Sequence, residues 1–231
     1  MARLLLLLLL VLPVSPTFAQ APCEIGTASD TLDANNVRAS LYNNGLLFSN
    51  RSGNIYNVPK APPGQPIQPN ALWVANLWFG GYIGSKLVNA TTGYATGQFN
   101  PGPLNPQGRP FSDCTRYDRI FKVTLADIQA LRTGTITEAV RAWPWAWGAP
   151  VSDGDGVPDN YNLGGSDRPE LMGTESHWWV MNAMGPHGRR DSFPLEVQVT
   201  AFAMPSLPTF QARIPAIYNS TLYRYRLLWR G

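Results

Sequence analysis

Residues 195–203, with the sequence LEVQVTAFA, alternate between apolar and polar side chains. Successive side chains of a β-strand point to opposite faces, so this period of two predicts a strand with one face against a core. Residues 220–230, STLYRYRLLWR, alternate in the same way and predict a second strand. In the first stretch the apolar side chains are Leu195, Val197, Val199 and Ala201, and the polar ones are Glu196, Gln198 and Thr200.

Further strand patterns extend this prediction to most of the chain. Residues 37–50 (VRASLYNNGLLFSN) predict a hairpin, because Asn43-Asn44-Gly45 offers residues that tolerate the positive φ angles of a tight turn. Residues 71–90 (ALWVANLWFGGYIGSKLVNA) predict a second hairpin that turns at Gly80-Gly81, and residues 118–124 predict another strand.

The remaining segments predict loops and one short helix. Thr124 and Asp127 have the spacing of a helix N-cap and Gly134 the place of a stop, so a helix is expected near 125–132. Residues 59–70 and 101–110 are proline-rich and predict long ordered loops, since proline cannot donate to a sheet. We therefore expect an all-β fold, an antiparallel β-sandwich with long Pro/Gly-rich loops, formed as one domain by residues 20–231.

The N-terminus has the layout of a secretory signal peptide. Arg3 supplies a positive charge, residues 4–12 form an unbroken apolar run, and a small residue stands at Ala19. The run is shorter than the about 20 apolar residues of a membrane span. We expect residues 1–19 to be removed, giving a secreted protein without a transmembrane anchor, located outside the cell or on its surface, or in the periplasm if the product is truncated.

Charge and motif content exclude several function classes. Charged residues make up 14% of the chain and the formal net charge is +3, so the concentrated basic face that binds nucleic acid is not expected. With two histidines and no HExxH motif, a three-histidine zinc site is impossible. No GxSxG motif occurs either, and no residue is assigned a catalytic role.

Residues 151–160, VSDGDGVPDN, contain three carboxylates within seven positions. With Gly156 at the sharp turn, Asp153, Asp155, the Val157 main-chain carbonyl and Asp159 have the spacing of calcium ligands. The pattern resembles the DxDGxxD core of thrombospondin type 3 and dockerin-like loops, which implies a structural calcium ion. Asp167 or Glu170 could complete the ligand shell from downstream. The alternative is an Asp/Gly turn that needs no metal.

Acidic and aromatic residues near this loop offer a second interpretation. Glycoside hydrolases use two carboxylates that flank a sugar-binding cleft, and a pair could come from Asp153, Asp159, Glu170 and Glu175. Trp143, Trp145 and Trp147 stand at alternate positions and, if extended, would form a platform for sugar rings. The alternative for these indoles is packing in a core or loop.

Several phrases along the chain carry a family resemblance. They are NNVRASLYNNG (35–45), YNVPK (56–60), ANLWFGGYIG (75–84), FNPGPL (99–104), CTRYDRIFKVT (114–124), DGDGVPD (153–159), WWVMN (178–182), LEVQVTAF (195–202) and TLYRYRLLWR (221–230). Together they resemble the N-terminal region of large secreted surface proteins of Bacteroidetes-type bacteria. The resemblance implies a surface location and export by type IX secretion through a C-terminal sorting domain, so this chain is expected to be a fragment of a longer protein, a truncated paralogue or a protein left in the periplasm. That family has no assigned active site.

These observations favour a secreted, non-enzymatic structural or adhesion module of the cell surface or extracellular matrix, with a calcium-stabilised loop. Its expected partners are cell-surface glycans or other surface proteins. The alternative is a carbohydrate-binding module or glycoside hydrolase that uses Asp or Glu near the tryptophan-rich region.

The two cysteines, Cys23 and Cys114, are predicted to form a disulfide in an oxidising compartment. The bond would close a loop of about 90 residues and stabilise the fold by at most about 4 to 5 kcal/mol. Non-reducing peptide mapping of the native protein is expected to show one linked pair, and reduction is expected to lower the melting temperature. Alkylation of both thiols without prior reduction would contradict this expectation.

Overall fold

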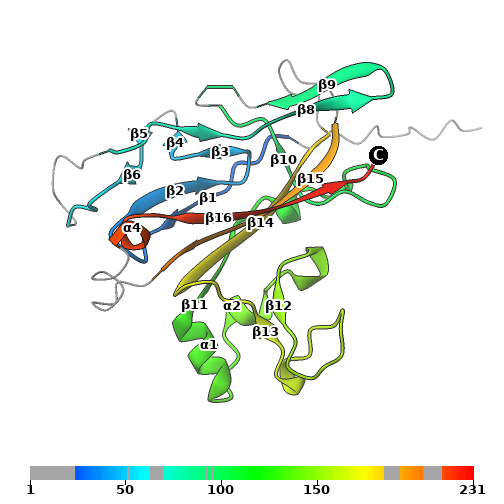
Figure 1. Cartoon of the computed structure of the whole chain (residues 1–231). Coiled ribbons are helices and arrows are strands. Elements are labelled where there is room, and N and C mark those ends of the chain that lie inside the picture. The colour runs from blue at the N-terminus through cyan, green and yellow to red at the C-terminus, as the bar shows by residue number, and fades with distance from the viewer. Residues whose placement is uncertain are drawn as a thin grey trace, which may run out of the picture.

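The alternating stretches 195–203 and 220–230 lie next to each other in an antiparallel sheet of the computed structural model (Figure 1). They form β15 (Phe193–Ala203) and β16 (Leu222–Trp229), paired from Leu195 opposite Trp229 to Phe202 opposite Leu222. The structure describes residues 24–50, 53–62, 70–91, 93–94, 96–184, 193–204 and 215–231.

The sheet that contains β15 and β16 is the second of two five-stranded sheets in chain order. It is built around β14 (Glu175–Ala183), which pairs with β15 along its length. The other edge of β14 carries β10 (Asn100–Pro101) and β11 (Phe121–Thr124). Every pairing in the sheet is antiparallel.

The first sheet also has five strands and is antiparallel. Three two-stranded pairs also occur among the described residues. The first sheet consists of β1 (Ser29–Leu32), β2 (Arg38–Tyr42), β3 (Leu46–Leu47), β6 (Tyr56–Asn57) and β7 (Ala75–Asn76). The pairs are β4 (Ser49–Asn50) with β5 (Gly53–Asn54), β8 (Trp78–Ile83) with β9 (Lys86–Thr91), and β12 (Val151–Ser152) with β13 (Arg168–Pro169).

The two sheets pack against each other to form an antiparallel β-sandwich, which confirms the predicted fold class. Their shared core contains Leu41 and Val37 from the first sheet side and Trp179, Val197 and Val199 from the second. The apolar face of β15 points into this core, as its alternation predicted.

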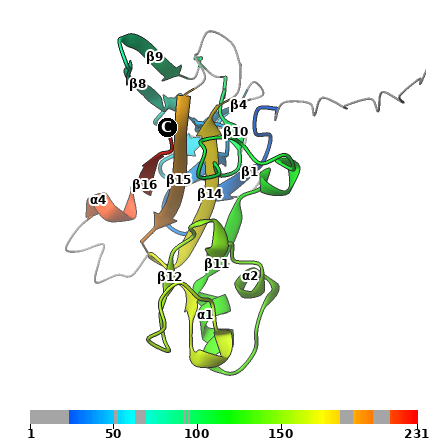
Figure 2. The ribbon, with the colours of Figure 1, turned by 90° about the vertical axis from the view of Figure 1, so that its right-hand side faces the viewer.

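The opposite face of the second sheet is covered as well, by a small helical layer at one end of the molecule (Figures 1 and 2). Trp178 and Val180 of β14 pack there with Phe121, Ile128 and Trp143 in a second apolar cluster. Strand β14 is therefore buried on both faces, and its two neighbouring tryptophans lie in different cores. Over the described residues of the whole chain, the helices and helical turns are η1 (Thr115–Tyr117), α1 (Leu125–Arg132), α2 (Glu138–Arg141), η2 (Trp145–Trp147), η3 (Leu163–Gly165) and α4 (Pro215–Tyr218), and α4 lies outside the covering layer.

Helix α1 begins and ends where the sequence predicted. The Thr124 hydroxyl accepts the Asp127 N–H, and the Asp127 carboxylate accepts the Thr124 N–H, so both orphan donors are satisfied in a capping box. Gly134 follows with a φ of 87°. The helix buries Ile128 against β11, and this contact holds the first helix of the covering layer on the sheet.

One hairpin is confirmed and the turn of the other is displaced from its predicted place. In the first, Leu41 pairs with Leu47 across a turn where Gly45 has a φ of 85°. In the second, Gly80 and Gly81 lie inside β8, and the chain turns at Gly84, which has a φ of 60°. The prediction of a turn at Gly80-Gly81 was wrong, because the later glycine takes the left-handed conformation.

An ion-pair group around the buried His177 joins the two sheets. His177 of β14 is 0% exposed, with Nε2 2.7 Å from Glu175 Oε1 and Nδ1 3.0 Å from Asp30 Oδ2 of β1. Lys122 Nζ lies 3.0 Å from the same Glu175 oxygen. Burial alone would lower the pKa of His177, but the hydrogen bonds and charges of Asp30 and Glu175 outweigh it and raise that pKa.

The pKa values of both carboxylates shift in the opposite direction. Burial tends to raise them, but contacts with His177 in both cases and with Lys122 lower the pKa of Asp30 and of Glu175. A raised histidine pKa stabilises the fold below about pH 6.5 and loses that contribution as the pH rises through the folded value. Lowered carboxyl pKa values stabilise the fold above about pH 4 and lose that contribution as the pH falls.

We predict that the group contributes most between about pH 4.5 and 6.5. Changing His177 to Gln is expected to lower the free energy of unfolding by about 2 kcal/mol near pH 6, since charge-assisted hydrogen bonds are lost. Denaturant unfolding as a function of pH measures this effect. His187→Gln is the matched control, because it removes the other histidine of the chain. Equal loss of stability at pH 6 and at pH 9 in the His177→Gln variant would contradict the assignment.

Candidate functional site

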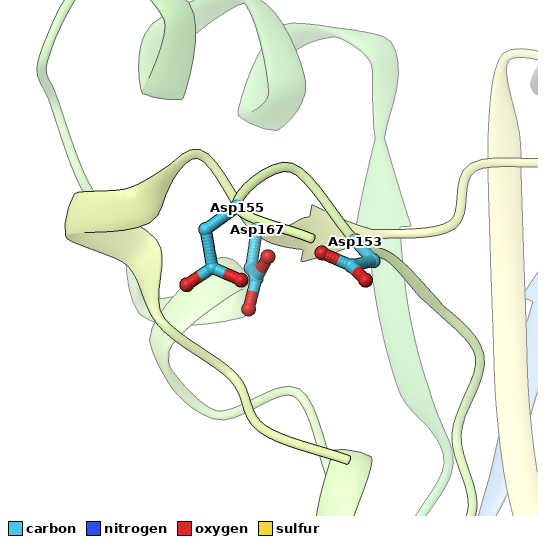
Figure 3. A group of neighbouring side chains, drawn as sticks. All are labelled: Asp153, Asp155 and Asp167. Carbon is cyan, nitrogen blue, oxygen red and sulfur yellow. The ribbon is translucent and has the colours of Figure 1, made fainter. Parts of the chain in front are cut away.

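The aspartate-rich loop is closed by a short ladder between β12 and β13. Val151 pairs with Pro169 and Ser152 with Arg168. Asp153 directly follows β12 and Asp167 directly precedes β13, so the ladder brings together two acids that are 14 positions apart. Figure 3 shows both carboxylates beside that of Asp155.

Asp153, Asp155 and Asp167 form a cluster that could hold a metal ion. One carboxylate oxygen from each lies within 4.8 Å of the others, and the three side chains range from exposed to buried. Two hydrogen bonds lower the pKa of the Asp155 carboxyl below its usual value. The Val157 N–H has the larger effect and the Asn162 side-chain amide the smaller one. A hard cation with oxygen ligands fits such a set of carboxylates.

Asp167 organises the loop from its buried side. It is 1% exposed, and its two oxygens accept the N–H groups of Gly154 at 2.8 Å and Asn162 at 2.7 Å. A Cβ at Gly154 would lie 2.2 Å from the Ser166 carbonyl oxygen, so only glycine allows these two segments to approach. Gly165 lies close to the Asp155 side chain, since a Cβ at this position would lie 2.6 Å from Asp155 Oδ2.

Two further positions, Asp159 and the Val157 main-chain carbonyl, were predicted as ligands from the sequence. Asp159 is not a member of the cluster, and its backbone has a left-handed φ of 61°. Val157 is 54% exposed, and its N–H donates to Asp155 Oδ1 at 2.9 Å. Glu170 lies 3.6 Å from Arg224 on β16. Of the two downstream acids considered from the sequence, Asp167 joins the cluster and Glu170 does not.

A groove of about 850 Å³ runs beside the loop. Its floor is the outer face of the second sheet, and its walls are the aspartate loop, the η2 turn and the segment before β11. Its charged and aromatic lining residues are Phe111, Arg116, Tyr117, Trp145, Trp147, Asp153, Asp159, Glu170, Trp178, Glu196, Arg224, Arg226 and Arg230.

The polar face of β15 forms part of the groove floor. Gln198 Nε2 donates to the Trp147 carbonyl at 3.1 Å and to Glu196 Oε1 at 2.7 Å. Glu196 is 1% exposed, and its other oxygen accepts the Leu104 N–H at 2.9 Å. These bonds attach the walls to the sheet, so the polar half of the alternation is buried.

The structure does not form the row of three indoles that an extended strand would give. Trp145 and Trp147 lie in the 3-10 turn η2 and line the groove, whereas Trp143 is 2% exposed in the second core. The Trp143 Nε1–H donates to the Pro150 carbonyl at 2.9 Å, which anchors the turn. The segment forms a turn after Pro144 instead of an extended strand, and the alternative considered from the sequence, packing in a core, applies to Trp143.

The four acids considered for glycoside hydrolysis do not all lie in the groove. Asp153, Asp159 and Glu170 line the groove. Glu175 belongs to the ion-pair group of His177 and is not among the groove residues.

The cysteine and signal-peptide predictions fall largely on residues outside the described ranges. Residues 1–23, and therefore Cys23, are among these, and so is His187. Cys114 is not a free thiol, and a bond between it and Cys23 stays a prediction. Among the described residues, no helix is long and apolar enough to span a membrane.

Comparison with models of protein families, with curated proteins and with solved structures gave no match. The site is therefore interpreted from its own geometry.

Changing Asp167 to Asn is predicted to destabilise the fold even without metal. An amide oxygen can accept one of the two N–H groups, but the amide NH₂ cannot accept the other, which costs about 1 to 3 kcal/mol. Denaturant unfolding in the presence of a chelator measures the change. Asp159→Asn is the matched control and is expected to stay within about 0.5 kcal/mol of the wild type, since the side chain is exposed and Asn tolerates a positive φ. Equal losses in both variants would contradict this role for Asp167.

Proposed function

We propose that this protein is a secreted, non-enzymatic binding module of the cell surface or extracellular matrix, in which calcium stabilises the loop beside the groove. The observation that carries the proposal is the convergence of Asp153, Asp155 and Asp167 next to an open groove. Asp153 belongs to both features, since it also lines the groove. The metal would therefore stiffen one wall of a binding surface.

Calcium suits this site better than zinc does. It takes six to eight oxygen ligands in flexible geometry, whereas zinc prefers nitrogen and sulfur. The cluster offers three carboxylates, and water can complete the shell at the exposed Asp153. With few protein ligands, a modest dissociation constant of about 10⁻⁴ to 10⁻³ M is expected, as in extracellular modules.

Exposed apolar side chains support a role in adhesion. Trp78, Tyr82 and Leu87 of the β8–β9 hairpin are 69%, 71% and 63% exposed. Tyr82 is paired with Leu87, and Trp78 lies four residues before Tyr82, so the three share one face. Exposed apolar patches of this kind are typical of interaction surfaces.

A second candidate function is carbohydrate binding or cleavage. It is favoured by the presence of Trp145, Trp147 and three acids, Asp153, Asp159 and Glu170, in one groove. Sugar rings stack on indole faces, and a carboxylate pair across a cleft is the requirement for glycoside hydrolysis.

The calcium proposal predicts a metal-dependent gain in stability. Binding to the folded state alone adds RT ln(1 + [L]/Kd), so calcium at about 10 mM should add about 1.4 to 2.7 kcal/mol. Thermal unfolding with calcium and with chelator measures this gain. The Asp155→Asn variant is expected to lose it, because one of the three charged ligands is neutralised.

Asp159→Asn is the matched control and distinguishes two ligand sets. If the cluster of Asp153, Asp155 and Asp167 binds the ion, this variant keeps the calcium-dependent gain. If the spacing in the sequence had identified the ligands correctly, it loses the gain. Melting curves of the wild type that coincide with calcium and with chelator would show that the loop is a metal-free turn.

A further inference from the structure

Two arginines lie next to each other on the groove side of β16. Arg224 and Arg226 are two residues apart on one strand, so their side chains point to the same face at a spacing of about 7 Å. Both line the groove, and Arg230 follows just beyond the strand end. The row presents positive charge along the β16 side of the groove floor.

The acids of the groove engage this row only weakly. Glu170 lies 3.6 Å from Arg224, and Glu196 lies 3.6 Å from Arg230. These are single, long contacts, whereas a guanidinium offers five donors and prefers a bidentate partner. For Arg226, the described residues include no carboxylate within ion-pair distance. Its guanidinium is therefore available to an anion from outside.

A buried acceptor lies beside Arg226. Gln198 is directly opposite Arg226 in the β15–β16 register and is 4% exposed. Its Nε2 is used by the Trp147 carbonyl and by Glu196, but its Oε1 is buried without a hydrogen-bond partner. A buried acceptor without a donor is costly, and a ligand hydroxyl group would satisfy it.

An aromatic surface completes the arrangement. Trp145 lines the groove and is 39% exposed. Its ring is stacked on that of Tyr161, with centroids 6.2 Å apart, which supports it at the groove edge. An indole held in this way offers an apolar face on which a sugar ring can stack.

From these features we infer that the groove binds an anionic oligosaccharide. Arg224 and Arg226 would hold the carboxylate or sulfate groups, Gln198 Oε1 would accept a hydroxyl group, and Trp145 would stack on a sugar ring. An acidic peptide would satisfy the arginines equally well but has no pyranose face for Trp145. The inference rests on the proposed function as a binding module and names the chemical class of its ligand.

Titration calorimetry with three test compounds distinguishes the ligand classes. A hyaluronan hexasaccharide carries alternating carboxylates, the N-acetylated chitin hexasaccharide has the same length without charge, and hexaglutamate carries charge without sugar rings. The hyaluronan fragment is expected to bind at least tenfold more tightly than either of the others. Raising the salt concentration from 0.1 to 1 M, which shortens the screening length from about 10 to about 3 Å, is expected to weaken it.

Three variants test the residues. Arg226→Gln removes the charge and is expected to weaken binding of the hyaluronan fragment about tenfold, while leaving the melting temperature unchanged because the side chain is exposed. Trp145→Ala is expected to weaken it by a similar factor. Arg132→Gln, on an exposed position of α1 outside the groove, is the matched control and is expected to bind as the wild type does.

Each contrary result has a distinct meaning. Equal binding of the N-acetylated chitin hexasaccharide and the hyaluronan fragment, or an unchanged affinity of Arg226→Gln, would overturn the anionic assignment while leaving a binding module for neutral glycans. Hexaglutamate binding at least as tightly as the hyaluronan fragment would overturn the saccharide assignment. Release of new reducing ends would instead overturn the proposed non-enzymatic function.

Discussion

The antiparallel pairing of β14 with β15 is the interaction on which both faces of the molecule depend. In its register Trp179 lies opposite Val199, and Trp178 lies opposite Thr200. Because side chains alternate, the first pair enters the sandwich core and the second faces the outer layer. A slip of one residue would exchange the faces and place Gln198 in the apolar core, so the register is strongly specified.

The polar half of β15 has a role that alternation alone does not reveal. A period of two predicts which side chains face a core, and the apolar side chains of 195–203 are indeed there. It says nothing about what covers the other face. Here the η2 turn, about fifty residues earlier in the chain, lies over Gln198 and bonds to it through the Trp147 carbonyl. Such a long-range contact has no local pattern, which is why the groove could not be predicted.

Local patterns therefore predicted local structure well and the site only in part. The capping box of α1 and the Gly45 turn depend on neighbouring residues and were found at their predicted positions. The aspartate cluster depends instead on a ladder of two residues per strand, which is too short to carry a hydrophobic period. That ladder brings in Asp167, whereas ligand spacing alone had favoured Asp159. The position of the Trp143 indole could not be predicted from residue spacing either. Its hydrogen-bond partner is a main-chain carbonyl, that of Pro150, which leaves no pattern of side chains in the sequence.

The same short ladder links the aspartate cluster to the arginine row. Asp167 precedes β13 and holds the N–H of Gly154, while Glu170 follows β13 and reaches Arg224. A cation bound at the cluster would neutralise Asp153 and hold β12 and β13 in place, and the position of Glu170 depends on that ladder. Both effects favour an anion beside Arg226, because one competing negative charge is removed and one wall is stiffened. Since coupling free energies between two sites are reciprocal, an anionic ligand in the groove would tighten calcium binding by the same factor.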